Sequence, residues 1–148
     1  MSGMGVGPGG GIFGGESIPV IESVLSFANQ RHTVLLNNVA NVDTPGYRAK
    51  DLPEGDFQKA LESAIESRRT GAEPLVLGTG LSVRRGADGG FELVPIANGD
   101  GVARNDGNNV AIDQEMAKLL KNAMSVQVFN RLLAVKFNGL ATAIRGRL

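Results

Sequence analysis

The longest regular pattern in this sequence lies at its C-terminal end. Between residues 112 and 144, seam positions recur at alternating spacings of four and three residues, and nine of the ten positions are apolar. This is the heptad spacing of helices that pack against a partner along their length. It predicts a helix of about 50 Å, capped at Asp113 and running to about residue 145. The predicted seam consists of Ile112, Met116, Leu119, Ala123, Val126, Asn130, Leu133, Phe137, Leu140 and Ile144.

A second long helix is expected near the N-terminus, over about 17–41. Ser17 can cap it, Pro19 is tolerated in its first turn, and its seam has the same four-three spacing. The two helices can pair with each other as a coiled-coil-like hairpin. A flanking apolar row, Leu120 to Val135, still leaves surface that such a pair does not cover, which is typical of a chain with partners. The N-terminal seam consists of Ile21, Leu25, Ala28, His32, Leu35 and Val39.

The middle of the chain changes character. A short amphipathic helix is predicted over 57–69, with Asp56 as its cap and Gly71 just past its end. Residues 72–111 read as a small β-rich or irregular insert, with β-prone runs at 75–77, 81–85 and 91–96 and a hairpin turn at 87–90. The predicted fold is mainly α. The expected divisions are a tail (1–16), an N-terminal helix and turn (17–51), a short helical segment (52–71), the insert (72–111) and a C-terminal helix (112–148).

The composition excludes several classes of function. Fifteen basic and fifteen acidic residues cancel, which argues against nucleic-acid or membrane-surface binding. There is no Cys and a single His, His32, so disulfides, Cys nucleophiles and Cys-based zinc sites are absent. The Gly-rich residues 1–15 lack the basic and apolar regions of a cleaved signal, and we expect a disordered tail. No apolar run is long enough to span a membrane.

No motif in the sequence predicts catalysis, a cofactor or a metal site. The G-x-G-x-x-G match at Gly5, Gly7 and Gly10 lacks the strand and helix that a nucleotide site requires. The loop 98–109 lacks the alternating frame of a calcium loop and is interpreted as turns. His32 is interpreted as a partly buried or interface residue. Asn130, the polar seam position, is either a buried device that fixes register or a solvated residue, and the sequence favours neither.

The stretch "NNVANVDTPGYRAKD" at 37–51 ends the first helix abruptly. Pro45 cannot continue a helix, and Gly46 follows it at the third position of what we predict to be a type II turn, where φ is positive. Tyr47 to Asp51 then form either an ordinary solvated loop or a segment presented to a partner. The sequence leaves these two alternatives open.

This stretch resembles the signature of the flagellar rod and hook axial proteins, through Asn38, Ala40, Asn41, Asp43, Thr44, Pro45, Gly46 and Tyr47. The segments "RAKD" (48–51), "DGNNVAIDQEMAKL" (106–119) and "LLAVKFNGLATAIRG" (132–146) are similar to proximal rod members in particular. The match covers about 25–51 and 106–146.

The resemblance implies a structural subunit of the flagellar proximal rod, with no enzyme activity. It would be exported by the flagellar type III system without a cleaved signal, and would assemble through its terminal helices. The implied partners are further copies, other rod proteins, the rod-base adaptor FliE and the export gate. The motif residues would contact neighbouring subunits. The alternatives are a different rod or hook axial protein, and a coiled-coil adaptor that stays in the cytoplasm.

Overall fold

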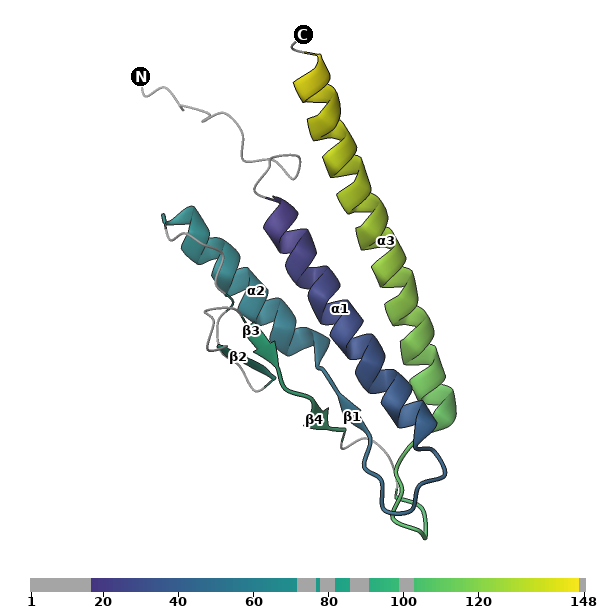
Figure 1. Cartoon of the computed structure of the whole chain (residues 1–148). Coiled ribbons are helices and arrows are strands. Elements are labelled where there is room, and N and C mark those ends of the chain that lie inside the picture. Colours follow the sequence, from purple (N-terminus) through teal and green to yellow (C-terminus); the bar gives the residue numbers. More distant parts are fainter. Residues whose placement is uncertain (1–16, 72–76, 78–81, 86–90, 99–102, 147–148) are drawn as a thin grey trace, which may run out of the picture.

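The computed structural model describes residues 17–71, 77, 82–85, 91–98 and 103–146 (Figure 1). It contains helices α1 (Ser17–Ala40), α2 (Glu54–Arg69) and α3 (Ile112–Arg145), of 24, 16 and 34 residues. The four strands are short: β1 (Lys50–Asp51), β2 (Val83–Arg85), β3 (Phe91–Leu93) and β4 (Ile96–Ala97). The predicted fold, mainly helical with two long terminal helices and a small β-containing insert, is confirmed.

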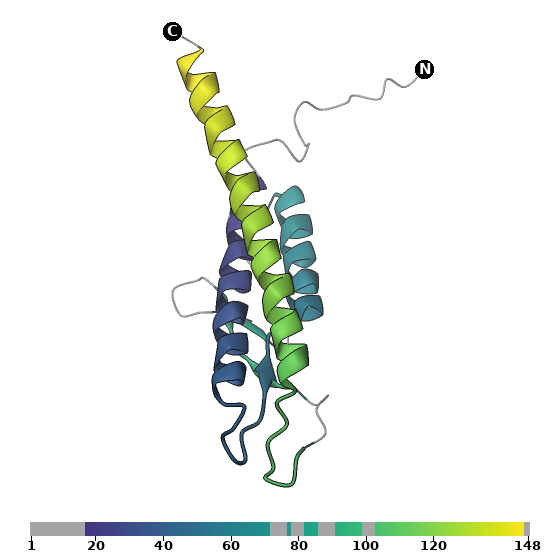
Figure 2. The same ribbon diagram turned by 90° about the vertical axis from the view of Figure 1, so that its right-hand side faces the viewer.

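Helices α1 and α3 lie side by side and run in opposite directions, and α2 lies along another side of α1 (Figures 1 and 2). Asn122 of α3 is level with Ala28 of α1, to whose carbonyl it is hydrogen-bonded. Ser17 is therefore level with about residue 133, and about 12 residues of α3, or roughly 18 Å, continue past it. Among the described residues, no helix is long and apolar enough to cross a membrane.

The strands form two small antiparallel pairs. β1 pairs with β4 through Lys50↔Ala97 and Asp51↔Ile96, and β2 pairs with β3 with Val83 opposite Leu93. β1 was not expected, because two charged residues show no alternation of apolar and polar positions. Leu77 is not in a strand, and the remainder of the predicted run 75–77 lies outside the described residues, as does the predicted turn 87–90.

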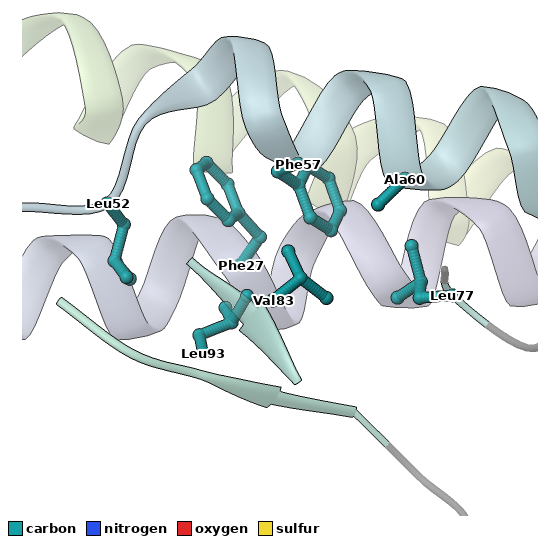
Figure 3. Packing of buried hydrophobic residues seen from close by; sticks show 7 residues of the cluster. All are labelled: Phe27, Leu52, Phe57, Ala60, Leu77, Val83 and Leu93. Carbon is teal, nitrogen blue, oxygen red and sulfur yellow. The ribbon is translucent and has the colours of Figure 1, made fainter. Parts of the chain in front are cut away.

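The main apolar cluster lies between α1, α2 and the β2–β3 pair (Figure 3). The rings of Phe27 and Phe57 stack with their centroids 4.2 Å apart and their planes at 13°. Val83, fully buried, and Leu93 close the cluster from the strand side. This packing attaches the insert to the helical frame, because each strand of the pair contributes a buried side chain.

Two predicted helix starts are wrong. α2 begins at Glu54, after Pro53 at the N-cap, and Asp56 therefore lies in the first turn instead of capping it. α3 begins at Ile112 after Ala111, so Asp113 likewise lies in the first turn. Neither N-cap residue accepts a side-chain cap bond, and acidic residues in the first turn instead complement the helix dipole. The end of α2 is as predicted, because Gly71 follows the C-cap with φ +99°.

Candidate functional site

The turn after α1 has the geometry that its sequence predicts. Gly46 has φ +71°, and the backbone N–H of Tyr47 donates to the carbonyl of Thr44 at 3.2 Å. A positive φ at the third position and this bond between the first and fourth residues are the two features of a type II turn. A Cβ placed on Gly46 would meet no atom within 4 Å. The need for glycine here therefore comes from backbone conformation alone.

Asn108, which is fully buried, ties this turn to the segment that leads into α3. Its Nδ2 donates to the carbonyls of Asn41, Val42 and Thr44 at 3.0, 3.0 and 2.8 Å. The backbone N–H of Gly46 adds a bond of 2.9 Å to the carbonyl of Asp106. Three carbonyls at and after the end of α1 thus accept from one side chain that precedes α3, and two of them also accept backbone N–H groups within the turn.

Asn109 repeats this arrangement one residue later. Its Oδ1 accepts from the backbone N–H of Ala49 at 2.7 Å, and its Nδ2 donates to the carbonyl of Asn98 at 3.0 Å. Asn109 therefore joins the start of β1 to the end of β4. Together, Asn108 and Asn109 make the closed end of the hairpin a single hydrogen-bonded unit.

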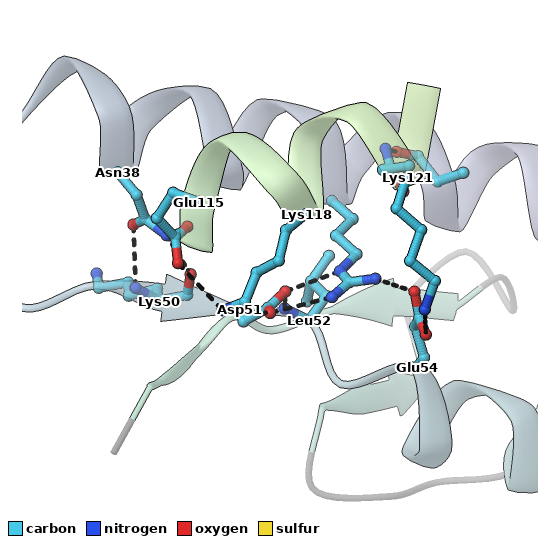
Figure 4. A network of polar contacts seen from close by, with 11 residues as sticks. Asn38, Lys50, Asp51, Leu52, Glu54, Glu115, Lys118 and Lys121 are labelled. Carbon is cyan, nitrogen blue, oxygen red and sulfur yellow. Dashed lines mark hydrogen bonds and ion pairs between the residues drawn. The ribbon is translucent and has the colours of Figure 1, made fainter. Parts of the chain in front are cut away.

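Asn38 lies behind the turn, on the last part of α1, and is also fully buried (Figure 4). Its Nδ2 donates to the carbonyl of Lys50 and to Oε2 of Glu115, both at 2.7 Å. Its Oδ1 accepts from the N–H of Lys50 at 3.0 Å and from the Tyr47 hydroxyl at 3.2 Å. Burial and the nearby Glu115 carboxylate raise the pKa of Tyr47. One amide therefore connects α1, the loop, β1 and α3.

A group of charged residues continues this network along α3 (Figure 4). The guanidinium of Arg31, a residue only 7% exposed, donates to both carboxylate oxygens of Asp51 at 2.8 and 3.1 Å, and it also pairs with Glu54. Lys118 approaches Asp51 at 3.4 Å, and Lys121 binds Glu54 at 3.0 Å. Each carboxylate is therefore shared between a cation from α1 and a cation from α3.

These pairs shift the ionisation of their members. Burial alone would raise the pKa of Asp51, but the hydrogen bonds and charge of Arg31, with Lys118, outweigh it, and the pKa is lowered. The pKa of Glu54 is lowered in the same way, with Lys121 and Arg31 outweighing burial. For Arg31, burial opposes the charge but the two carboxylates prevail, and its pKa is raised. All three groups are therefore ionised at neutral pH.

The N-terminal seam faces α3 and the interior. Ile21, Leu25, Ala28 and Leu35 are buried, and His32 and Val39 are half-buried. Nδ1 of His32 is buried and has no hydrogen-bond partner. Within the described part of the chain, no cluster of His, Asp and Glu could hold a metal ion.

The C-terminal seam is divided between two faces of α3. Leu119 is buried, and Ala123, Val126 and Leu133 are half-buried. The row that completes the contact with α1 lies one residue away from the predicted positions, at Glu115, Asn122 and Phe129. The remaining seam residues are exposed: Ile112, Met116, Asn130, Phe137, Leu140 and Ile144. In this single chain Asn130 is exposed, and the amide that α3 buries against α1 is Asn122.

The exposed apolar residues of α3 form a continuous surface. The flanking row predicted from the sequence is 40–66% exposed, and we call it the outer row: Leu120, Met124, Val128, Leu132 and Val135. Side chains of this size are individually unremarkable on a surface, but a contiguous row along one helix indicates a contact surface.

The motif residues divide into an inner and an outer set. Asn38 is buried, Asn41 and Tyr47 are half-buried, and these bond within their own chain. The exposed members are Ala40, Asp43, Thr44, Pro45 and Gly46. The exposed members gather at the closed end of the hairpin, where residues 41–47 lie beside the loop before α3 (Figure 1).

Sequence reasoning missed the residues that hold this site together. Asn108 and Asn109 were interpreted as part of a chain of turns, and Arg31, Glu115 and Asn122 were assigned no role. One signal was present: Glu115, Asn122 and Phe129 are seven residues apart, which places them on one stripe of the helix. Polar residues at heptad spacing beside an apolar seam are candidates for hydrogen-bonded interface positions.

Two long antiparallel terminal helices meet at this hydrogen-bonded turn, and residues 38–47 resemble the signature of the flagellar axial proteins. The comparisons with known proteins narrow the class. The chain is 33% identical over 133 residues to the flagellar basal body rod protein FlgB of Bacillus subtilis, covering 88% of this chain and 94% of that protein. It is 30% identical over 132 residues to FlgB of Borrelia hermsii, covering 87% and 96%.

FlgB of Aeromonas hydrophila is also similar, with 33% identity over 138 residues, 88% of this chain and 94% of that protein. No family model matches the chain. The identity and the nearly complete coverage show that the chain belongs to the FlgB family of flagellar basal body rod proteins.

Proposed function

We propose that this chain, as a FlgB-family structural subunit of the basal body rod, assembles by packing α3 against the helices of neighbouring subunits. The observation that carries the proposal is the outer row of α3, which is apolar and 40–66% exposed. Fully burying a large aliphatic side chain is worth about 1.5–3 kcal/mol, so a row of this length can drive association. The rod context comes from the family.

The polar network supports this role by presenting the outer row on a defined frame. Glu115 and Lys118 engage Asn38 and Asp51, and Lys121 engages Glu54, so the first half of α3 is held in place by directional bonds. An interface built on such a frame loses little side-chain and backbone freedom when it forms. The polar network therefore serves to hold α3 in position, and we assign the site no catalytic residue and no cofactor.

The proposal also covers the export route of the chain and its assembly partners. The chain would leave the cell through the flagellar type III export gate without a cleaved signal, and would assemble in the periplasm. Its partners would be further copies, other rod proteins and the rod-base adaptor FliE, and its mechanical task would be to link the base to the drive shaft. The exposed motif residues at the closed end, Asp43 to Gly46, would contribute a second contact.

The test is to place a charge on the outer row. Val128→Asp should leave the fold intact, because the side chain is 62% exposed, but should exclude the chain from isolated basal bodies. Gln127→Asp, on the adjacent exposed position, is the matched control and should assemble. Immunoblots of basal bodies and of secreted material separate assembly from export. Normal incorporation of the Val128 variant would refute the assigned surface, and retention of the unmodified chain in the cytoplasm would favour an adaptor.

A further inference from the structure

The end of α3 that continues past α1 carries an apolar stripe of its own. Phe137, Leu140 and Ile144 are 50%, 45% and 71% exposed, and their spacing of three and four residues places them on one side of the helix. Figure 1 shows this end of α3 rising beyond the ends of both α1 and α2. We call the segment Ala134–Arg145 the overhang.

A groove lies lower on the same chain, between α2 and α3. Its apolar walls are Val24, Phe27, Phe57, Leu61 and Phe129, and its volume is about 360 Å³. Lys121 and Glu54 close one end of the groove with their ion pair. A concave site of this size and polarity is suited to a few apolar side chains projecting from a helix.

The two surfaces also differ in charge. All 15 acidic residues lie at or before Glu115, whereas six of the 15 basic residues follow it, so α3 from Met116 onward has no acidic side chain. The overhang carries Lys136 and Arg145. On α2, Glu54 lines the groove and is paired with Lys121 and Arg31, and Glu62 and Glu66, the latter 3.4 Å from Arg69, follow on the exposed side of the helix.

We propose that the overhang of one copy docks in the α2–α3 groove of the next copy. Phe137, Leu140 and Ile144 would enter the apolar groove, and the basic overhang would lie beside the acidic residues of α2. This inference rests on the proposed rod function and names the partner surface for α3. Because the two patches are different surfaces of the same chain, the contact is head-to-tail and can join more than two copies, in a ring or a helical array.

Disulfide crosslinking tests the contact cleanly, because the chain has no native cysteine. Leu61→Cys and Leu140→Cys are introduced together into one chain, and cells that build flagella are treated with a mild oxidant. Leu140 lies about 11 residues, or roughly 16 Å, beyond Phe129 at the groove wall, so the two cysteines are too far apart to bond within one copy. A ladder of trimers and larger species is expected, whereas each single-cysteine chain can give dimers at most.

The control pairs Leu140→Cys with Leu36→Cys, on α1, whose residue is 48% exposed and lies away from the groove. We expect at least a tenfold lower yield of multimers from this pair. An equal yield would overturn the proposal, and so would the absence of a ladder from rods that contain the doubly substituted chain. In that second case the rod function would stand, since incorporation is scored separately. A chain that is missing from rods in its unmodified form would instead refute the proposed function.

A second measurement tests whether the basic overhang binds an anionic membrane surface instead of the groove. Purified chain is sedimented with anionic phospholipid vesicles and with neutral ones. The proposal expects no more than a twofold difference between the two. Strong, salt-sensitive binding to the anionic vesicles that Leu140→Asp abolishes would overturn the proposal and assign the overhang to a membrane surface.

Discussion

The side-chain amide of Asn38 donates to the carboxylate of Glu115 over 2.7 Å, and the two residues are 0% and 2% exposed. They are separated by 77 residues of sequence and join the end of α1 to the start of α3. The same amide also satisfies both backbone groups of Lys50 and accepts from Tyr47. Asn38 is therefore the point at which the terminal helices and the intervening chain meet.

Replacing Asn38 with Ala should destabilise the fold by about 3 kcal/mol. The substitution removes the Asn38 partner from Oε2 of the buried Glu115, whose Oε1 keeps Lys118 at 3.0 Å, and it removes both side-chain bonds to the backbone of Lys50, at about 1–3 kcal/mol for each unsatisfied group. Urea denaturation followed by circular dichroism measures the change. Asn37→Ala, at the adjacent exposed position, is the control and should remain within about 0.5 kcal/mol of the parent chain. Equal losses from the two variants would contradict the assigned role.

The stability of the chain should fall in acid because of Asp51 and Glu54. Their pKa values are lowered in the folded chain, so the unfolded chain, in which carboxyls titrate near about pH 4, binds these protons more tightly. The stabilisation is therefore fully present above about pH 4 and is lost as the pH falls toward the lowered values. Melting temperatures recorded between about pH 7 and about pH 3 should show the decline.

The double variant Asp51→Asn, Glu54→Gln should flatten this acid-induced decline. At neutral pH the Asp51 change alone should cost about 3–5 kcal/mol, because it leaves the buried guanidinium of Arg31 without its two-oxygen partner. Glu62→Gln, on the exposed side of α2, serves as the charge-matched control for the Asp51 change alone. A double variant with the full acid slope of the parent chain would show that these pairs do not govern it.

Gly46→Val should destabilise the turn more than Gly46→Asn. The residue has φ +71°, which costs an L-residue about 1–2 kcal/mol, and a β-branched side chain exceeds that range while Asn tolerates the conformation. No atom lies within 4 Å of the added Cβ, so the difference reports conformation and not collision. Thermal unfolding of the two variants measures it. Equal melting temperatures would show that the turn relaxes at little cost.

Leu119 and Leu120 are neighbours in sequence, and we expect an Asp substitution to affect stability at the first and assembly at the second. Leu119 is 8% exposed and faces α1, whereas Leu120 is 65% exposed in the outer row. Leu119→Asp should destabilise the isolated chain by several kcal/mol because a charge is buried without a partner. Leu120→Asp should leave the stability unchanged and abolish assembly. Denaturation of the purified chain and immunoblots of basal bodies make the two measurements, and a stable Leu119 variant would show that the α1–α3 contact is misassigned.

The parts of the fold that follow from apolar spacing could be predicted from sequence. The extents of α1 and α3 came from heptad spacing, and the turn at Gly46 came from the Pro-Gly pair. The face of α3 was harder to assign, because Leu119 and Val126 belong both to the predicted seam and to the observed contact. The rows differ in whether residues 116, 123 and 130 or residues 115, 122 and 129 complete them, and at the first of these positions the apolar choice, Met116, is exposed while Glu115 is buried.

The polar ties could not be predicted because their partners are far apart in sequence. Asn108 is an ordinary turn residue until the carbonyls of Asn41, Val42 and Thr44 are placed around it. Nothing in the sequence likewise links Arg31 to Asp51 and Glu54, which lie 20 and 23 residues away from it. The role of the motif residues in subunit contacts stays a prediction. The hydroxyl of Tyr47 bonds to Asn38 of its own chain.

The hydrogen bonds across the α1–α3 contact have a mechanical consequence. A purely apolar pair of helices can slip by a turn, about 5.4 Å, and find similar packing again. Here the same slip would separate Asn122 from the Ala28 carbonyl and Glu115 from Asn38 at once, and would also separate Lys121 from Glu54 of α2 if α2 stays packed on α1. The shear load needed to displace one helix past the other is therefore the load that breaks all of these bonds together. A shaft assembled from such subunits would transmit thrust and torque through each chain without gradual slippage of α3 along α1.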